Sequence, residues 1–284
     1  MMSIAPIISI GELKEICNKP EVLIFDASNH KHAREQYAHK HLQGAFFVDI
    51  NTQLADIQPD VAVGGRHPLP TIADFSTTLR ILGISSTSHV IVYDDSKGAN
   101  AAARFWWMLK AVGHDKVQVL NGGIQAAEQF GFPMQTGINI PVPAAENYPM
   151  QQWLLPIAQM DEVEQVSQKD DYLVIDVRDA YRYNGESEPI DLIAGHIPGA
   201  ENIPFTENLD AAGLFLQPDV LKEKYAQITE GKSTDHIIVH CGSGVTACHT
   251  LLAMSYAGLE IPKLYVGSWS EWSRNAKEIV KHVS

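Results

Sequence analysis

The sequence predicts an α/β protein built from two similar halves, each with a mostly parallel sheet flanked by helices. Two observations support this prediction. Short apolar runs typical of buried strands alternate with segments of helical periodicity in both halves. Blocks of sequence also recur in the same order about 150 residues apart, which is close to the usual length of one domain. A chain of 284 residues has room for two such domains.

Four pairs of blocks carry the repeat. They are EVLIFDAS with DYLVIDVRD, HLQGAFFVDI with HIPGAENIPF, HVIVYDDSKG with HIIVHCGSGV, and VQVLNGG with PKLYVGS. Because all four pairs keep their order, we expect a duplicated domain. Between the halves, residues 137–156 contain four prolines and show no clear periodicity, as is typical of a linker. The predicted domains are residues 1–140 and 150–284, with a boundary near residue 145.

Local signals mark the helices of the first half. Ser9 and Glu12 have the spacing of a capping box that opens a helix. Thr71 is expected to cap a helix over residues 72–82, and Gly83 is expected to end it. The first half therefore combines helices with strand-like runs, as an α/β domain requires.

The charge of the chain limits its partners. Asp and Glu number 34 against 21 Lys and Arg, which gives a net charge of −13. An acidic surface repels phosphate backbones and anionic membranes, so we expect neither nucleic acid nor a membrane as a partner. Residues 236–259 carry no Lys, Arg, Asp or Glu. Their hydroxyls, histidines and glycines nevertheless favour a buried strand, a loop and a helix over a membrane span.

The first residues and the cysteines indicate a compartment. Residues 1–9 have neither a basic region nor a long apolar core, so no signal peptide is expected. The three cysteines, Cys17, Cys241 and Cys248, do not make a disulfide scaffold. We therefore expect a reducing, cytoplasmic location.

The segment HIIVHCGSGVTACHTLL is the most informative for chemistry. An apolar strand over residues 237–239 leads to Cys241, a loop with two glycines follows, and a helical pattern begins near Ala247. Glycines let backbone N–H groups converge on one point, and a helix N-terminus adds its dipole. Both features favour a thiolate, which is a nucleophile. We therefore expect Cys241 to be a reactive cysteine rather than a structural residue.

Two other cysteine chemistries fit this loop poorly. Cysteine-dependent phosphatases carry an arginine six residues after the cysteine, where this chain has Ala247. Zinc sites usually place two to four residues between cysteines, whereas six separate Cys241 from Cys248. A regular helix would hold these two cysteines about 10 Å apart, too far for a disulfide. Cys248 is therefore expected in the core, with a resolving thiol as the alternative.

The chain resembles the tandem-domain rhodanese family of sulfurtransferases over nearly its whole length. The motifs that carry the resemblance are GRHPLP, GHIPGA, CGSGVTAC and GSWSEW. CGSGVTAC is the most specific and is similar to the 3-mercaptopyruvate branch, whereas the thiosulfate branch typically has two basic residues directly after the cysteine. A neutral loop suits 3-mercaptopyruvate, which has one carboxylate, better than the compact thiosulfate dianion.

The resemblance implies two tandem rhodanese-like domains and a sulfurtransferase without cofactor or metal. Cys241 would take sulfur from 3-mercaptopyruvate as a persulfide, release pyruvate and pass the sulfur to a thiol, thioredoxin or cyanide. In the first half Asp94 takes the position of Cys241, which implies a catalytically silent N-terminal domain. The loop amides expected to stabilise thiolate and persulfide are those of Gly242, Gly244, Val245 and Thr246.

Arginines are the expected substrate anchors. Arg182 stands at the family's position for an arginine that binds the substrate anion, and Arg178 is expected to pair with nearby acidic groups. The 3-mercaptopyruvate branch often has a second arginine before GHIPG, where this chain has Ile190 and a shorter loop. Thiosulfate therefore remains the alternative donor. A non-catalytic persulfide carrier is a third hypothesis, which the complete loop around Cys241 disfavours.

His67 of GRHPLP matches a family histidine from the silent domain that reaches the active site, where Ser243 would complete a proton relay. Capping of the following helix is the alternative for Ser243, and a structural hydrogen bond is the alternative for His67. Asn51 stands where related enzymes have an aspartate that orients the histidine, with Asp49 two residues earlier. Asparagine can hold a tautomer but cannot stabilise an imidazolium by charge. Arg66 is expected to add positive potential to the cleft.

The remaining histidines and tryptophans are interpreted more simply. Four histidines lie close together in the first half, but no carboxylate or cysteine pattern accompanies them, so we expect no metal site. They are His30, His32, His39 and His41. His41 also pairs with His196 in the repeat and is expected to be structural. Trp269 and Trp272 are expected in a loop that lines the cleft rim or packs between the domains.

Overall fold

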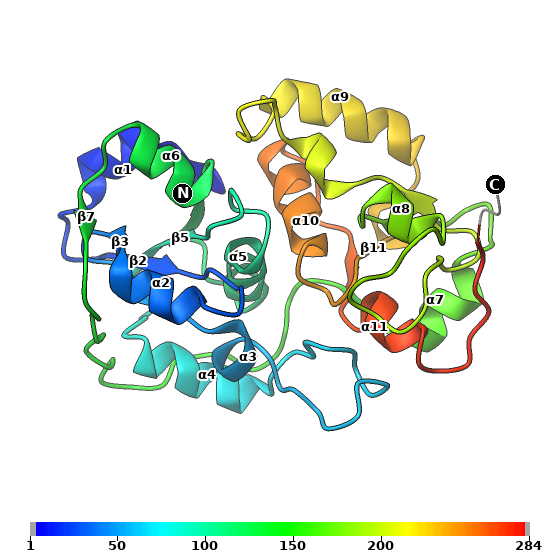
Figure 1. The fold of residues 1–284 in the computed structure, drawn as a ribbon, viewed down its shortest axis with the longest axis horizontal. Coiled ribbons are helices and arrows are strands. Elements are labelled where there is room, and N and C mark those ends of the chain that lie inside the picture. Colours follow the sequence, from blue (N-terminus) through cyan, green and yellow to red (C-terminus); the bar gives the residue numbers. More distant parts are fainter. Residues whose placement is uncertain (1–3, 282–284) are drawn as a thin grey trace. The chain divides into compact units, whose positions relative to one another are not determined.

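The computed structural model describes residues 4–281. These residues form two compact units, whose α-helices and some of whose strands are labelled in Figure 1. Unit 1 comprises the chain up to Leu54, Pro70–Leu154 and Ala211–Phe215. Unit 2 comprises Ala55–Leu69, Leu155–Asp210 and the chain from Leu216 onward.

Unit 1 contains a five-stranded sheet that is parallel throughout. In spatial order its strands are β1 (Ile7–Ile8), β6 (Val117–Leu120), β5 (His89–Tyr93), β2 (Val22–Asp26) and β4 (Phe46–Phe47). A separate antiparallel pair consists of β3 (His41–Leu42) and β7 (Met134–Gln135). The helices are α1 (Ile10–Ile16), α2 (Ala33–His39), α3 (Ile50–Gln53), α4 (Ile72–Ile81), α5 (Ala101–Ala111) and α6 (Gly123–Gln129).

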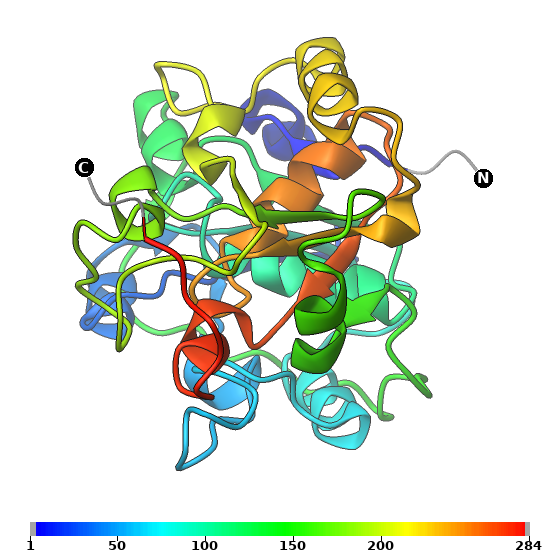
Figure 2. The same cartoon turned by 90° about the vertical axis from the view of Figure 1, so that its right-hand side faces the viewer.

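Unit 2 contains a second five-stranded parallel sheet. Its strands are, in spatial order, β10 (Glu201–Asn202), β9 (Leu173–Asp176), β11 (Ile237–His240), β12 (Lys263–Tyr265) and β8 (Ile157–Ala158). The α-helices are α7 (Met160–Val166), α8 (Ala180–Tyr183), α9 (Pro218–Thr229), α10 (Ala247–Tyr256) and α11 (Ser268–Trp272). Short 3-10 helices are η1 (Phe205–Asn208) and η2 (Thr234–His236). Figure 2 shows α9 and α10 on one face of this sheet and α7 and α11 on the other.

The two sheets have the same topology, which confirms the predicted α/β fold with two mostly parallel sheets. Reading unit 1 as β4-β2-β5-β6-β1 and unit 2 as β10-β9-β11-β12-β8 gives matching chain orders. The registers also match, because Asp26 pairs with Tyr93 in unit 1 and Asp176 pairs with His240 in unit 2. The next residue along β5 is Asp94 and the next along β11 is Cys241. Asp94 and Cys241 therefore occupy equivalent positions.

The expected helix ends of the first half are confirmed. Ser9 and Glu12 form a complete capping box at α1. The Thr71 side chain accepts the N–H of Asp74 at the start of α4. Gly83 follows the last turn of α4 with a φ of +74°, a left-handed conformation that glycine adopts without strain.

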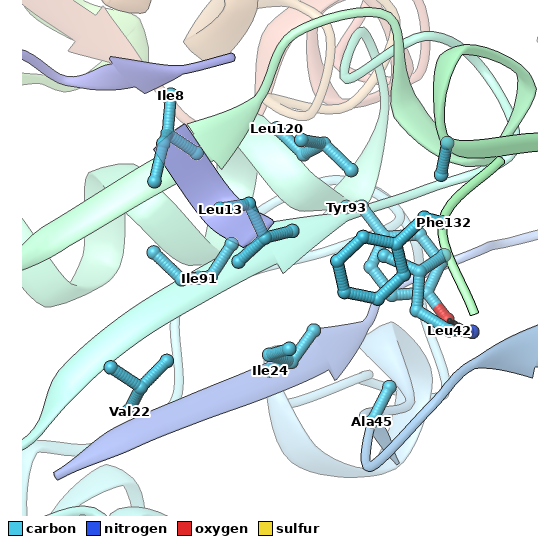
Figure 3. Packing of buried hydrophobic residues seen from close by; sticks show 11 residues of the cluster. Ile8, Leu13, Val22, Ile24, Leu42, Ala45, Ile91, Tyr93, Leu120 and Phe132 are labelled. Carbon is cyan, nitrogen blue, oxygen red and sulfur yellow. Dashed lines mark hydrogen bonds between the residues drawn. The ribbon is translucent and has the colours of Figure 1, made fainter. Parts of the chain in front are cut away.

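Buried apolar residues between sheet and helices form a core in each unit. Figure 3 shows the core of unit 1, where Leu13 of α1 packs with residues of β1, β2, β5 and β6. In unit 2 the core includes Val163 of α7, Ile238 of β11 and both tryptophans of α11, Trp269 and Trp272. These cores account for the apolar strand runs in the sequence, because strands of a parallel sheet are covered on both faces.

Residues 236–259 form the end of η2, strand β11, a loop and helix α10. This order matches the expectation for the uncharged window. Within residues 4–281, the helices lack the length and apolar character needed to cross a membrane.

His41 and His196 have the same role in the two units. The His41 ring stacks on Tyr37 at 4.1 Å between centroids, and its Nδ1 lies 2.7 Å from the Tyr37 carbonyl oxygen. His196 stacks on Tyr183 at 3.8 Å, and its Nδ1 lies 2.8 Å from the Tyr183 carbonyl oxygen. Both histidines are buried. The structural role expected for His41 is therefore supported by its contacts.

The segment 55–69 belongs to unit 2, although it precedes most of unit 1 in the chain. Three hydrogen bonds to the region after β12 explain this. Gly64 N donates to Glu271 Oε1 at 2.9 Å, and Asn275 Nδ2 donates to the Ala62 carbonyl at 2.8 Å. Arg66 N donates to Ser270 Oγ at 3.0 Å. The units thus differ from the ranges 1–140 and 150–284 expected from sequence by this segment, by Ala211–Phe215 and by a division after Leu154.

The stability of unit 2 is expected to fall at mildly acidic pH because His249 of α10 is fully buried. Burial lowers the pKa of His249 to about 3, whereas an unfolded histidine titrates near 6.5. Below pH 6.5 the unfolded chain therefore binds a proton that the folded chain does not. Proton binding by the unfolded chain therefore lowers the unfolding free energy by about 2 kcal/mol when the pH falls from 7 to 5.

Urea denaturation at both pH values tests this expectation. The His249→Met chain should lose about 2 kcal/mol less between pH 7 and pH 5 than the unmodified chain. The same substitution at His39, which is exposed on α2, serves as the control. Equal losses in the His249→Met chain and the unmodified chain would contradict the assignment.

Candidate active site

Cys241 lies at the carboxyl end of the central strand β11 and is 1% exposed. The loop 241–246 joins this strand to α10, as the sequence predicts. In open parallel sheets this edge is where ligands bind, because the loops that follow neighbouring strands meet there. Cys241 therefore stands at the usual place for chemistry in such a fold.

Ser268 holds the shape of the cysteine loop. Its Oγ accepts the N–H groups of Cys241 at 3.2 Å and of Gly244 at 3.0 Å, and donates to the Tyr265 carbonyl at 2.8 Å. Two further bonds tie the loop to α11, from Trp269 N to the Cys241 carbonyl at 3.0 Å and from Ser270 N to that of Gly242 at 2.8 Å. Sequence reasoning missed Ser268, although it lies within the motif GSWSEW. The Gly244 N–H, expected to face the thiolate, donates to Ser268.

The two loop glycines are required for different reasons. Gly244 has a φ of +69°, and a Cβ there would lie 2.5 Å from the Val266 carbonyl oxygen, so any side chain would be both strained and obstructed. At Gly242 a Cβ would lie 2.9 Å from Arg66 Nη2 and 3.4 Å from Arg182 Nη2. The missing side chain at Gly242 therefore leaves room for two guanidinium groups beside Cys241.

Arg182, on α8, is buried beside this loop. Its Nη2 lies 2.8 Å from Glu188 Oε1 and 3.2 Å from Asp191 Oδ2. Burial alone would lower the pKa of Arg182, but its hydrogen bond to Glu188 and the negative charges of Glu188 and Asp191 outweigh burial and raise the pKa. Arg182 therefore stays charged beside Cys241, as an anion anchor requires. No sequence motif pointed to Glu188 or Asp191 as residues of the site.

Arg178 pairs with acidic groups deeper in unit 2. It forms ion pairs with Asp176 and with Glu188, and it donates to the Gly195 carbonyl at 2.7 Å. Its guanidinium lies 4.5 Å from the ring centroid of Trp269. These contacts agree with the structural role expected from the sequence.

His67 and Ser243 meet in unit 2. His67 Nδ1 lies 2.8 Å from Ser243 Oγ, and both side chains are buried. His67 reaches this position because the segment 55–69 packs with the region after β12. Asn51 lies in α3, and its N–H donates to Asp49, which caps that helix. The orientation of His67 by either residue stays a prediction.

Trp269 and Trp272 do not lie in a loop at a cleft rim. Both are on α11 and almost fully buried in the core of their own unit. Each indole N–H donates to a backbone carbonyl, that of Ile193 at 2.8 Å for Trp269 and that of Glu278 at 2.9 Å for Trp272. The prediction of a loop was wrong. Helix α11 has only five residues, which is too short for helical periodicity to be recognised in the sequence.

The other two cysteines lie elsewhere. Cys248 is fully buried on α10 and donates to the Gly244 carbonyl oxygen at 3.3 Å, and Cys17 is half-buried at the end of α1. Cys248 thus has the core position expected from the sequence. The resolving-thiol alternative stays untested.

Comparison with known proteins identifies the family. The rhodanese-like domain model matches residues 9–129 and again residues 159–275. The chain belongs to the rhodanese family. Because the domain occurs twice, it is a tandem-domain member, which confirms the resemblance seen in the sequence.

Three similar proteins illustrate both branches of the family. A probable 3-mercaptopyruvate sulfurtransferase of Pseudomonas aeruginosa is 37% identical over 95% of this chain and 96% of its own. The thiosulfate sulfurtransferase of Rattus norvegicus is 34% identical over 90% of this chain and 86% of its own. The crystal structure of SseA from Escherichia coli, described as a 3-mercaptopyruvate sulfotransferase, superposes with a TM-score of 0.77 at 32% identity and covers 94% of this chain and 100% of that one.

In the first rhodanese-like domain, Asp94 fills the place of the cysteine. Its carboxylate accepts four backbone N–H groups of the loop that follows β5. The donors are Ser96 at 2.9 Å, Gly98 at 2.7 Å, Asn100 at 3.0 Å and Ala102 at 3.1 Å. Burial raises the pKa of Asp94 to about 6 in spite of these donors. The loop of this domain thus binds an anion supplied by its own chain.

Within residues 4–281 there is no cluster of three or more His, Cys, Asp or Glu side chains placed to hold an ion. His30 Nε2 instead lies 3.1 Å from Asp95 Oδ2, and His32 Nδ1 lies 3.1 Å from Glu35 Oε2.

Proposed function

We propose that this protein is a sulfurtransferase that moves sulfur from 3-mercaptopyruvate to a thiol, thioredoxin or cyanide through a persulfide on Cys241. The proposal rests on Cys241, buried at the carboxyl edge of the sheet, with the charged guanidinium of Arg182 close to the neighbouring Gly242. The names of the 3-mercaptopyruvate sulfurtransferases that this chain resembles support it.

In the first half-reaction, the Cys241 thiolate attacks the thiol sulfur of 3-mercaptopyruvate. A sulfur–sulfur bond forms, the carbon–sulfur bond breaks, and its electron pair stays on carbon as the enolate of pyruvate. The enolate takes a proton and leaves as pyruvate. Ser243, 2.8 Å from His67, is suited to deliver that proton, with His67 resupplying it.

In the second half-reaction, an acceptor thiolate attacks the outer sulfur of the persulfide. A new sulfur–sulfur bond forms on the acceptor, and Cys241 leaves as a thiolate, ready for another donor. The N–H groups of Gly242, Val245 and Thr246 are proposed to stabilise the anionic sulfur in both forms. Turnover of this kind requires Cys241 to be reduced, which fits the cytoplasmic location expected from the sequence.

Thiosulfate is the second candidate donor. It is favoured by the similarity to the thiosulfate sulfurtransferase of Rattus norvegicus and by Ile190, where the 3-mercaptopyruvate branch often has an arginine. The loop itself argues against thiosulfate, because residues 242–247 contain no basic side chain and a dianion gains more from cations than a monoanion does.

Steady-state sulfur transfer with the two donors in parallel decides between them. We expect kcat/KM to be at least about tenfold higher with 3-mercaptopyruvate, which corresponds to about 1.4 kcal/mol of transition-state discrimination. A preference for thiosulfate would overturn the donor but keep the nucleophile. A lack of turnover with either donor, with a persulfide that still forms on Cys241, would favour the carrier hypothesis.

A further inference from the structure

A cavity of about 440 Å³ lies at the carboxyl edge of the sheet of unit 1. All its lining residues belong to unit 1, from α2, α6 and the segments that follow β2 and β5. They include Asp26, the last residue of β2, with Ser28, Asp95 and Ile124. Pockets for small molecules measure about 300–1,000 Å³, and open parallel sheets bind ligands at this edge. The cavity therefore has the size and place of a binding site.

The duplicated domain shows what fills the corresponding place in unit 2. Ser28 N donates to Asp26 Oδ1 at 2.9 Å. In unit 2, Arg178 N donates to Asp176 Oδ1 at 3.0 Å, so Ser28 is the counterpart of Arg178. The guanidinium of Arg178 pairs with the aspartate, because its Nε lies 3.0 Å from both carboxylate oxygens. Serine cannot supply this cation to unit 1.

A second large side chain of unit 2 is also replaced by a smaller one. Trp269 N donates to the Cys241 carbonyl at 3.0 Å. In unit 1, Ile124 N donates to the Asp94 carbonyl at 3.1 Å, so Ile124 is the counterpart of Trp269. The tryptophan ring lies 4.5 Å from the guanidinium carbon of Arg178. The smaller isoleucine leaves space beside Asp26 and lines the cavity.

The chain that adds a further partner for Arg178 in unit 2 has no counterpart in unit 1. The stacked tyrosine and histidine that the units share are 4 residues apart in unit 1 and 13 residues apart in unit 2. The longer connection of unit 2 carries Glu188, whose carboxylate pairs with Arg178. Unit 1 therefore lacks the arginine, the aromatic ring beside it and this second carboxylate, and the cavity lies in the place that they would take.

The Asp26 carboxyl group is buried, and its hydrogen-bond partners are neutral. It is 2% exposed and bonds to Ser28 and to the Tyr93 hydroxyl. Burial raises the pKa of Asp26. Burial alone would also raise the pKa of Asp176, but the charge of Arg178 is the largest of the effects that lower it below its usual value. The equivalent carboxyl groups thus differ in one respect, which is the guanidinium that only Asp176 has beside it.

The other charges of the cavity leave it negative. Lys40 pairs with Glu128 at 2.6 Å, and both side chains are exposed. Asp95 lies 3.1 Å from the His30 ring. Among the described residues that line the cavity, three carry a carboxyl group and only Lys40 carries a fixed positive charge. The cavity therefore favours a cationic ligand.

We propose that the cavity of unit 1 binds a small molecule with a guanidinium group, which pairs with the carboxylate of Asp26. A guanidinium is planar and presents paired N–H donors that match two carboxylate oxygens. Unit 2 places the same group on the equivalent aspartate, within its own chain. The ligand would therefore supply to unit 1 the cation that its sequence lacks at Ser28. This site does not depend on sulfur transfer at Cys241.

Ligand-observed NMR titration of the full chain with three probes tests the chemistry of the ligand. Methylguanidinium carries the proposed group, methylurea has the same shape without the charge, and methylammonium has the charge without the planar fork. We expect saturable binding of methylguanidinium, at least about tenfold tighter than binding of either other probe. A lack of binding, or equal binding of methylguanidinium and methylurea, would overturn the proposal. Equal binding of methylammonium would overturn the assignment of a guanidinium.

Two pairs of variants test the place of binding. Asp26→Asn removes the carboxylate and should weaken binding of methylguanidinium at least about tenfold. Glu35→Gln removes an exposed carboxylate from α2 outside the cavity and should leave binding unchanged. Ser28→Arg should abolish binding, because the chain then provides its own guanidinium, as unit 2 does. Ser28→Ala keeps the cavity open and should still bind the probe.

Unchanged binding in both Asp26→Asn and Ser28→Arg would show that the probe binds elsewhere and would refute the site. A further titration with the tripeptide Gly-Arg-Gly separates the two sources of a guanidinium. If the tripeptide binds at least about tenfold tighter than methylguanidinium, the ligand is an arginine side chain of a partner protein and not a small molecule. Circular dichroism of each variant checks that it is folded, and the two Ser28 variants carry the test if Asp26→Asn is not.

Discussion

Replacing Cys241 by serine is expected to abolish sulfur transfer, with kcat at least about a thousandfold lower for every donor. A serine hydroxyl stays protonated near neutral pH and forms no persulfide, whereas the shape of the residue is almost kept. Residues of α11 hold Cys241 through its backbone, because its N–H donates to Ser268 Oγ and its carbonyl accepts the N–H of Trp269. The serine variant should therefore fold normally and still bind carboxylates.

Cys17→Ser provides the matched control, because Cys17 lies half-buried at the end of α1 in the other unit. It should retain full activity. Mass spectrometry after incubation with 3-mercaptopyruvate should find one added sulfur atom on Cys241 in the unmodified chain and none in the Cys241→Ser chain. Full activity of Cys241→Ser, or sulfur bound to Cys248 instead, would refute the proposed nucleophile.

The parts of the fold that repeat were predictable from the sequence. Apolar strand runs, an ordered set of paired blocks and helix caps such as Ser9 and Thr71 are local signals, and each is reproduced in the structure. The equivalence of Asp94 and Cys241 also followed from the blocks, because both residues come directly after strands that pair with Asp26 or Asp176.

The geometry of the candidate site was predictable only where a residue lies in a family motif. The position of Cys241 after β11 and the contact between His67 and Ser243 belong to this group, whereas the catalytic and binding roles of these residues stay predictions. The carboxylates Glu188 and Asp191 were missed because their partners are charges brought close only by folding. The membership of segment 55–69 in unit 2 was missed for the same reason, since it depends on bonds to residues about 200 positions later.

Ser268→Ala is expected to damage both stability and catalysis, because one hydroxyl holds three backbone groups of the site. Without it, the buried N–H groups of Cys241 and Gly244 lose their acceptor, and the Tyr265 carbonyl loses a donor. Each buried donor left unsatisfied costs about 1–3 kcal/mol, so we expect the unfolding free energy to fall by about 2–5 kcal/mol. Ser268 has a φ of +55°, which alanine tolerates no better than serine, so the change isolates the hydroxyl.

Ser273→Ala is the matched control for this experiment. Ser273 is also buried and directly follows α11, but its Oγ has no hydrogen-bond partner among the described residues. Its removal should therefore change the unfolding free energy by less than about 0.5 kcal/mol. Urea denaturation of both variants, with kcat measured below the transition, separates the two effects. We expect kcat of Ser268→Ala to be about ten- to a hundredfold lower, because a loop that moves by 1 Å misplaces the thiolate. If Ser268→Ala behaves like Ser273→Ala in both measurements, the loop is held by the bonds from Trp269 and Ser270 alone, and Ser268 has no positioning role.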